Sequence, residues 1–365
     1  MQVLPGAENL NEYRSLLSGK RVGVVAHQAS LISKEKKTIH LVDALLNHDI
    51  HIQKVFAPEH GFRGTADAGE KIKNQIDPKT KLPIISLYGD NRKPTAEQLE
   101  GIDIMVFDLQ DVGVRFYTYL STLHYVMEAC AENKIPLVVL DRPNPNAHYV
   151  DGPVLDQEHT SFVGMHPVPI VYGMTIGEYA QMINGEKWLD QELNCDLTVI
   201  PIQNYSHNTV YTLAVRPSPN LPNAKSIALY PSLCLLEPTV ISVGRGTSKQ
   251  FQIYGHPKFS KTDFSFTPQS NFGSKYPKHQ GQICYGKDLS ETESPNKIEL
   301  KWLLNAYAEF PQKDSFFLSG FERIAGVSSL RKQIEAGEKE NTIRDSWLEN
   351  LETFKKVRAN YLIYP

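Results

Sequence analysis

The sequence lacks several features that mark specialised classes of protein. Its four cysteines, Cys130, Cys195, Cys234 and Cys284, are widely spaced and form no CxxC pair, which argues against a cysteine zinc site and a dithiol redox motif. No apolar run reaches the roughly 18 residues that a membrane-spanning helix requires. The formal net charge is −3 and there is no basic block, so we expect neither a nucleic-acid surface nor a membrane span.

Glycine-rich nucleotide-binding motifs are absent as well. The first expected strand, residues 21–27, ends at His27-Gln28-Ala29-Ser30, where a dinucleotide-binding fold would carry GxGxxG. No phosphate-binding GxxxxGK(S/T) motif occurs, and Gly244-Arg245-Gly246-Thr247 lacks the lysine and the spacing of one. We therefore predict no cofactor.

The beginning of the chain, Met1 to Glu8, has neither the basic region nor the apolar stretch of a signal peptide. We expect a periplasmic or secreted protein if an export signal has been removed, and a cytoplasmic protein otherwise. The sequence does not choose between these locations, and it does not indicate the oligomeric state.

What is present is the composition of an ordinary soluble protein, with 41% hydrophobic and 22% charged residues. A chain of 365 residues exceeds what one hydrophobic core usually serves, so we expect two domains. In the first half, strands and helices alternate, which implies parallel strands with helical crossovers. The expected strands are residues 21–27, 50–57, 83–89, 102–108 and 136–141, and the expected helices begin at Thr38 and span residues 117–133. The fold class predicted is α/β, with a Rossmann-like doubly wound sheet.

The second half is less regular. Thr175 and Glu178 have the spacing of a helix capping box. Further elements are expected as strands at residues 196–202, 251–254 and 282–285, and as helices at residues 298–310, 321–336 and 342–358. We place the domain boundary near residue 240, which gives a catalytic domain at 1–240 and a smaller α+β domain at 241–365 that completes the cleft.

Polar residues follow four of the expected strands. They are His27-Gln28, Glu59-His60, Asp108 with Gln110 and Asp111, and Asp141-Arg142 with Asn144. The carboxyl ends of parallel strands share one edge of a doubly wound sheet, so these side chains are candidates for one pocket.

Glu59 is the best single candidate for a catalytic group. It stands at a strand end, between a proline and a glycine-rich turn, where the backbone can approach a ligand closely. A carboxyl group in a partly desolvated cleft acts as a general acid or base. The alternative is a loop carboxylate paired with Arg63, and we favour the catalytic role.

Asp108 and Asp111 offer a second carboxylate or, with His27 and His60, a divalent metal site. The alternative is that Asp111 caps a turn and pairs with Arg115. We favour no metal, because no HxH or HExxH spacing accompanies the aspartates.

Two further groups could orient a ligand. Arg115 with Tyr117 suits this role, because arginine binds carboxylates through a bidentate fork, although the tyrosine could equally pack a helix. Glu237 and Arg245 form either an inter-domain salt bridge or a pair that closes the site from the second domain.

Taken together, these segments resemble the exo-β-N-acetylmuramidases of the NamZ type, over essentially the whole chain. The motifs that carry the resemblance are Pro58-Glu59-His60-Gly61-Phe62-Arg63-Gly64, Phe107 to Tyr119 (FDLQDVGVRFYTY), Asp141-Arg142-Pro143-Asn144-Pro145, His166-Pro167, Gly173 to Glu178, Ser218 to Pro222 and Gly244 to Thr247. Two segments depart from the family's pattern: Glu237-Pro238-Thr239 stands where Glu-Gly-Thr is usual, and His256 interrupts another motif.

The resemblance implies a glycoside hydrolase that removes terminal β-linked N-acetylmuramic acid from the non-reducing end of peptidoglycan fragments. It implies Glu59 as the catalytic carboxylate; its partner is Asp108, Asp111, Glu158, Glu178 or Glu237, or the substrate's own acetamide. Arg115 or Arg63 would hold the lactyl carboxylate of muramic acid. The residues expected to bind the peptidoglycan-derived saccharide are His27, His60, Arg63, Asp108, Gln110, Arg115, Tyr117, Asn144, Asn220 and Arg245. Two alternatives remain: a metal-dependent hydrolase using Asp108 and Asp111, and a sugar-binding protein without catalysis.

Overall fold

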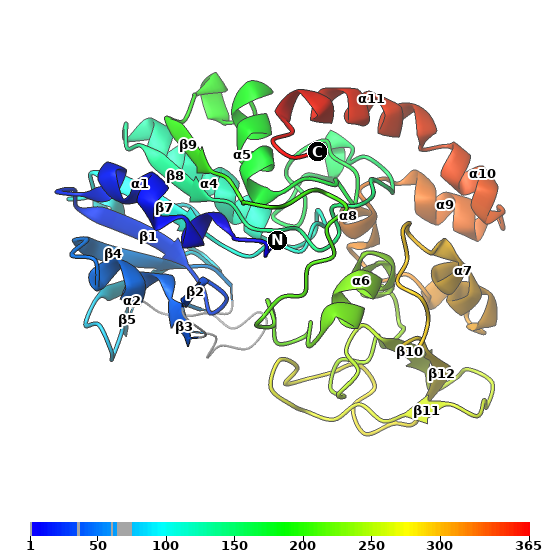
Figure 1. Ribbon diagram of the computed structural model, residues 1–365. Helices are drawn as coiled ribbons and strands as arrows, with labels where there is room; N and C mark the ends of the chain where they lie inside the picture. The colour runs from blue at the N-terminus through cyan, green and yellow to red at the C-terminus, as the bar shows by residue number, and fades with distance from the viewer. Residues whose placement is uncertain (1, 35–36, 60, 64–74) are drawn as a thin grey trace.

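Within residues 2–34, 37–59, 61–63 and 75–365, which the computed structural model describes, one seven-stranded sheet organises the first half of the chain (Figure 1). Its order is β5-β6-β4-β1-β7-β8-β9, with β5 antiparallel to β6 and the other neighbours parallel. If the six parallel strands are numbered by their order along the chain, they lie across the sheet in the order 3-2-1-4-5-6, which is that of a Rossmann-type sheet. The strands are β1 (Val22–Ala26), β4 (Ile52–Ala57), β5 (Gln75–Ile76), β6 (Pro83–Ser86), β7 (Ile104–Asp108), β8 (Leu137–Leu140) and β9 (Leu197–Ile200).

Both faces of this sheet are covered by helices. Successive side chains of a strand point to opposite faces, and in the central strands the side chains of both faces are buried and, apart from Asp108, apolar. Val24 belongs to a buried cluster with α1 and α2, whereas its neighbour Val25 belongs to a cluster with α4 and α5. The helices are α1 (Leu10–Leu17), α2 (Leu41–Leu46), α3 (Ala96–Leu99), α4 (Tyr119–Glu132) and α5 (Ile176–Gly185). The predicted α/β fold with a doubly wound sheet is confirmed.

The helix predicted to begin at Thr38 is wrong at its start. Thr38 and Ile39 lie in β3 (Lys37–His40), which pairs with β2 (Leu31–Lys34) in an antiparallel hairpin. The β-branched side chains of both residues favour a strand. Helix α2 begins after His40, whose Nδ1 accepts a hydrogen bond of 3.2 Å from the backbone amide of Val42. The capping box of Thr175 and Glu178, in contrast, is present at the start of α5.

The second half of the chain contains a small antiparallel sheet in the order β10-β12-β11, with helices beside it (Figure 1). The predicted helix at 321–336 is two helices, because Gly326 ends the first in a left-handed conformation at φ 84°. The predicted helix at 342–358 is also divided. The elements are α6 (Ala224–Leu233), β10 (Ile253–His256), β11 (Ser265–Phe266), β12 (Cys284–Asp288), α7 (Leu300–Glu309), α8 (Phe321–Ala325), α9 (Ser329–Glu335), α10 (Glu340–Asp345) and α11 (Leu348–Arg358).

The last residues return to the large sheet. Arg358 of α11 donates to the backbone carbonyl of Gly173, and the Tyr364 hydroxyl donates to Asp141 Oδ2 at 2.7 Å and accepts from the Ile202 amide at 2.8 Å. Figure 1 accordingly shows the C-terminus beside α5. We call the part of the chain that carries the large sheet the sheet unit, and the part from α6 to α10 (residues 224–345) the second unit. The chain passes between the two units twice, after β9 and before α11.

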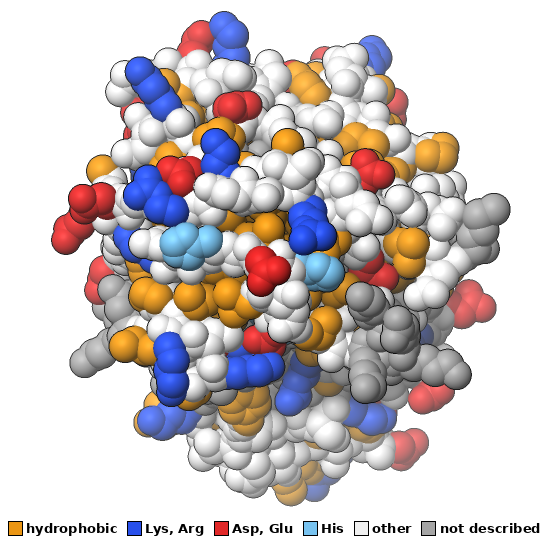
Figure 2. All heavy atoms as spheres, turned by 60° about the vertical axis from the view of Figure 1, so that its left-hand side comes forward, with side chains coloured by type: hydrophobic (Ala, Val, Ile, Leu, Met, Phe, Trp, Pro, Cys, Tyr) orange, Lys and Arg blue, Asp and Glu red, His pale blue; other side chains and the backbone are white. Residues whose placement is uncertain are grey.

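The surface of the described residues is chemically mixed. On the face shown in Figure 2, hydrophobic side chains gather across the middle, and acidic and basic side chains lie dispersed around them. Among the described residues, no helix combines the length and the apolar composition that a bilayer crossing demands.

Candidate active site

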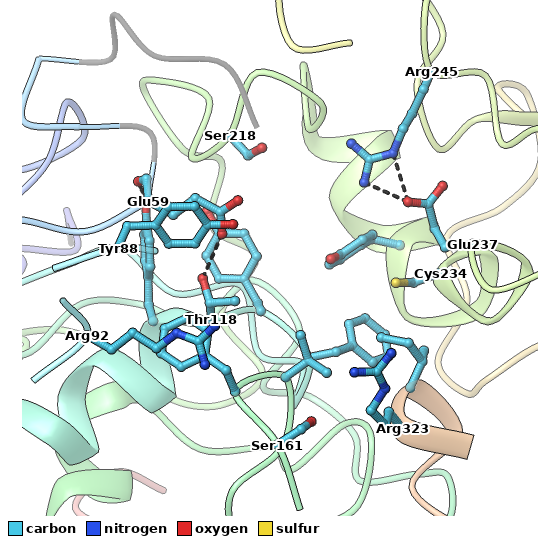
Figure 3. A pocket seen from close by; sticks show the side chains of 17 residues that line it. Glu59, Tyr88, Arg92, Thr118, Ser161, Ser218, Cys234, Glu237, Arg245 and Arg323 are labelled. Atoms are coloured by element: carbon cyan, nitrogen blue, oxygen red, sulfur yellow. Dashed lines mark hydrogen bonds and ion pairs between the residues drawn. The ribbon is translucent and has the colours of Figure 1, made fainter. Parts of the chain in front are cut away.

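A cavity of about 540 Å³ lies where the carboxyl edge of the large sheet meets the second unit (Figure 3). The segments that follow β4, β6 and β7 supply one wall, including Glu59, Tyr88 and Tyr117. The opposite wall comes from the segment after α6 and from α8, including Glu237 and Arg323. The position agrees with the rule that ligands of such sheets bind beyond the carboxyl ends of the strands.

Glu59 stands two residues beyond the end of β4 and projects into this cavity (Figure 3). Its Oε2 accepts a hydrogen bond of 3.1 Å from Thr118 Oγ1. The Tyr88 hydroxyl is a second hydrogen-bond partner, and burial together with the negative charge of Glu59 raises the pKa of that tyrosine. Glu59 therefore points into the cavity with hydroxyl groups around it, and the alternative pairing with Arg63 is wrong.

The backbone of Glu59 is supported from below by a hydrogen-bonded chain. The backbone amide of Gln110 donates to His27 Nε2 at 2.9 Å, so Nε2 carries no proton and the neutral ring is protonated on Nδ1. Nδ1 lies 3.1 Å from the Tyr119 hydroxyl, which donates in turn to the Glu59 carbonyl at 3.3 Å. His27 is fully buried. It supports the site from below and does not line the cavity.

Glu237 and Arg245 form a salt bridge within the second unit, not the inter-domain salt bridge considered from the sequence, and both residues line the cavity (Figure 3). Nε and Nη2 of Arg245 both lie 2.8 Å from Oε2 of the carboxylate. No hydrogen bond from the described residues reaches Oε1. Burial acts to raise the pKa of Glu237, but the charge and hydrogen bond of Arg245 and the charge of Lys278 outweigh it, so the pKa lies below its usual range. The carboxylate is ionised at neutral pH.

Aromatic rings form much of the remaining lining. Tyr117 and Tyr230 both border the cavity, with ring centroids 6.5 Å apart, and Phe116 packs edge-on against Tyr230 at 5.3 Å. The Tyr117 hydroxyl is engaged by the Pro217 carbonyl at 2.9 Å. Tyr117 therefore offers its ring to a ligand, and such faces suit the apolar side of a sugar ring.

Arg115 does not reach the cavity, although we expected it to bind a carboxylate. It is 2% exposed, and its guanidinium donates to the carbonyl oxygens of Pro153, Val168, Ile324 and Ala325 at 2.7–3.1 Å. Burial without a carboxylate partner lowers its pKa to about 9, which keeps it protonated at neutral pH. All of its described hydrogen bonds go to backbone carbonyls, so Arg115 joins the sheet unit to α8.

Asp108 and Asp111 are also scaffold residues. Asp108 is fully buried and holds Arg142 through two contacts, at 2.5 and 2.9 Å. Asp111 caps a turn, as the alternative from the sequence proposed, but its Oδ2 accepts from the Gly113 amide and the Tyr172 hydroxyl, not from Arg115. Burial raises the pKa of Asp111 to about 6. Among the described residues, no group of three or more His, Cys, Asp or Glu side chains is placed to hold a metal ion.

The other expected ligand residues also have partners away from the cavity. Arg63 pairs with Asp77 and Asp43. The side-chain amide of Gln110 donates to the backbone carbonyls of Asp111 and Pro143. The side-chain amides of Asn144 and Asn220 donate to the backbone carbonyls of Met174 and Gly273, respectively. Of the candidate second carboxylates, Glu178 is buried in its capping box, where it also bonds His207. Glu158 lies beside His159 and does not line the cavity. His60 lies outside the described residues.

Several lining residues were not predicted. Tyr88 lies within the strand predicted at 83–89, but the observed strand β6 ends at Ser86, so Tyr88 stands just beyond the strand end. Arg92, Ser161 and Arg323 come from a loop, a turn and a helix, and no pattern in the sequence distinguishes them from surface residues.

Comparisons with known proteins agree with this geometry. The family model for the N-terminal part of exo-β-N-acetylmuramidase NamZ matches residues 22–225, and the model for its C-terminal part matches residues 228–364. The peptidoglycan β-N-acetylmuramidase NamZ of Bacillus subtilis strain 168 is 39% identical over 97% of this chain and 89% of its own length. Two crystal structures of DUF1343 family proteins from Bacteroides fragilis NCTC 9343 each cover 100% of this chain and 99% of their own, at TM-scores of 0.92 and 0.84 with 43% and 27% identity. The chain belongs to the exo-β-N-acetylmuramidase NamZ family.

Proposed function

We propose that this protein is a glycoside hydrolase that releases terminal β-linked N-acetylmuramic acid from the non-reducing end of peptidoglycan fragments. The observation that carries the proposal is the pair of carboxylates, Glu59 and Glu237, on opposite walls of one cavity (Figure 3). Glycosidic cleavage requires two groups of this kind: one gives a proton to the leaving oxygen, and one acts at the anomeric carbon.

Glu59 takes the role of the general acid. Its hydrogen bonds from Thr118 and Tyr88 orient the carboxyl group in the cavity, where it can give a proton to the glycosidic oxygen. The chain through His27 and Tyr119 fixes the backbone beneath it. Positioned acids of this type contribute roughly 10²- to 10⁴-fold to a rate.

Glu237 takes the complementary role. Arg245 binds only Oε2, so Oε1 is the oxygen that is left to act on the substrate. An ionised carboxylate at this place stabilises the positive charge that develops on the sugar ring in the transition state.

The experiment compares the wild type with Glu59→Gln on a chromogenic β-N-acetylmuramide. The matched control is Glu97→Gln, an exposed glutamate on α3. We expect kcat to fall by about 10²- to 10⁴-fold in Glu59→Gln and to stay unchanged in Glu97→Gln.

Binding separates this function from a sugar-binding protein. Calorimetric titration with N-acetylmuramic acid is expected to give similar Kd values for the wild type and Glu59→Gln, because the amide keeps the shape of the cavity. Binding by a wild type that hydrolyses no muramide would favour a binding protein, and full activity in Glu59→Gln would remove Glu59 from the mechanism.

A further inference from the structure

The charges that line the cavity do not cancel. Glu237 is neutralised by Arg245, and Glu59 is the other acidic residue in the lining. Arg92 and Arg323 also line the cavity, and no carboxylate of the described residues lies within ion-pair distance of either. The five charged side chains therefore carry one net positive charge, which favours an anionic ligand.

We propose that Arg323, together with Arg92, binds the carboxylate of the substrate's lactyl group and thereby selects muramic acid over glucosamine. This inference rests on the proposed function and assigns the specificity within the same site. N-acetylmuramic acid differs from N-acetylglucosamine by the lactyl ether on C3, so a group that recognises its carboxylate distinguishes the two sugars.

The two guanidinium groups lie at the end of the cavity away from Glu237 and Arg245 (Figure 3). In that view, Arg92 comes from the wall that carries Glu59, and Arg323 comes from α8 on the other side, with Ser161 between them. C3 is two carbons from the anomeric carbon, so a sugar whose C1 faces the carboxylates can direct its lactyl group toward this end. A guanidinium fork matches a carboxylate in two hydrogen bonds.

Arg92 is held in place by neutral groups, and the space that Arg323 occupies depends on a glycine. Arg92 lies over the Phe162 ring, 4.5 Å from the centroid, and donates through Nε to the Gly89 carbonyl at 3.1 Å, which leaves its Nη groups for a ligand. Arg323 lies against Gly320, where a Cβ atom would come within 2.8 Å of Nη2. A side chain at position 320 would therefore displace the guanidinium.

An unpaired hydroxyl stands at the same place. Ser161 lines the cavity, and its buried Oγ has no hydrogen-bond partner among the residues that the structure describes. A buried hydroxyl without a partner costs free energy, and a carboxylate oxygen from the substrate would satisfy it. The third arginine of the lining, Arg245, already has its charge paired with a carboxylate, because Nε and Nη2 both bind Glu237 Oε2.

The test uses two chromogenic substrates with the same leaving group, a β-N-acetylmuramide and a β-N-acetylglucosaminide. We expect Arg323→Met to lower kcat/KM on the muramide by roughly 10- to 100-fold, since a charge-assisted fork is lost, and to leave activity on the glucosaminide within threefold. Arg323→Lys, which keeps the charge and loses the fork, is expected to lie between. Arg331→Met on the neighbouring helix α9 is the matched control and should behave as the wild type.

The outcomes separate this inference from the proposed function. If the ratio of kcat/KM on the muramide to kcat/KM on the glucosaminide is the same in Arg323→Met as in the wild type, the assignment is overturned. The wild-type activity would still support the hydrolase. If the wild type hydrolyses neither substrate, the proposed function fails, and calorimetric titration with free N-acetylmuramic acid decides the carboxylate site. Weaker binding to Arg323→Met than to Arg331→Met supports it, and equal binding refutes it.

Discussion

Arg115→Met tests how the two units are held together. The guanidinium of Arg115 makes four hydrogen bonds to the carbonyls of Pro153, Val168, Ile324 and Ala325, and methionine fills much of its volume but makes none. Hydrogen bonds of a charged group contribute about 1.5–3 kcal/mol each, whereas removing a buried charge recovers a desolvation cost of several kcal/mol. We expect a net loss of ~3 kcal/mol from these opposing effects.

The assay is thermal unfolding followed by calorimetry. Unfolding entropy of about 2.1 cal/mol/K per residue gives ~0.8 kcal/mol/K for a chain of this length, so Tm should fall by about 4 °C. The control is Arg331→Met, a half-exposed residue paired with Glu335 and Glu322, where we expect less than about 1 kcal/mol. Because Arg115 fixes the carbonyls next to Arg323, KM for the muramide should also rise. A variant that melts within a degree of the wild type, with unchanged KM, would refute the reasoning.

Four further outcomes are expected. Tyr119→Phe removes the hydroxyl that donates to the Glu59 carbonyl, so kcat should fall roughly tenfold through lost positioning with KM unchanged; a wild-type kcat would contradict this. Arg245→Met removes the main charge that lowers the pKa of Glu237, and burial then raises it. The ionised form would be lost at a higher pH, so the acidic limb of the pH–rate profile should move upward, and a limb that stays in place would argue against Glu237. Asp108→Asn leaves a buried arginine without its anion and should destabilise the fold by about 3–5 kcal/mol in chemical denaturation. Dialysis of the wild type against EDTA should leave activity within twofold; a loss restored by a divalent ion would favour the metal-dependent alternative.

The sequence predicts the layers of this fold well, because burial on both faces produces short, continuous apolar strands between helices. The strand order is not visible in that pattern, since it depends on which strands pair in space. Local chemistry also has limits. The capping box of Thr175 and Glu178 is found from spacing alone. Thr38 and Ile39, in contrast, continue the apolar pattern of the helix that follows, although their β-branched side chains favour a strand, and pairing with β2 decides between the two.

The site, like the fold, is only partly predictable from the sequence. Glu59 is predictable because its place at a strand end follows from the order of elements. Arg115 and Arg323 are both arginines near glycine, and nothing local tells which one is buried among carbonyls and which one faces a cavity. That difference arises from the packing of α8 against the sheet unit. The carbonyls of Ile324 and Ala325 that bind Arg115 are more than two hundred residues away from it in the sequence.

The return of the chain to the large sheet has a mechanical consequence. The unit that carries Glu237 and Arg323 is connected on both sides, by the segment after β9 and by the segment before α11, and Tyr364 anchors the second connection. Between these two connections, side chains also bind the same unit to the sheet unit, through Arg115 to the carbonyls of Ile324 and Ala325 and through the salt bridge of Asp151 with Arg344. Because the unit is fastened at several separate places, the wall that carries Glu237 is held in one alignment with the wall that carries Glu59, and a saccharide meets two carboxylates whose spacing is already set.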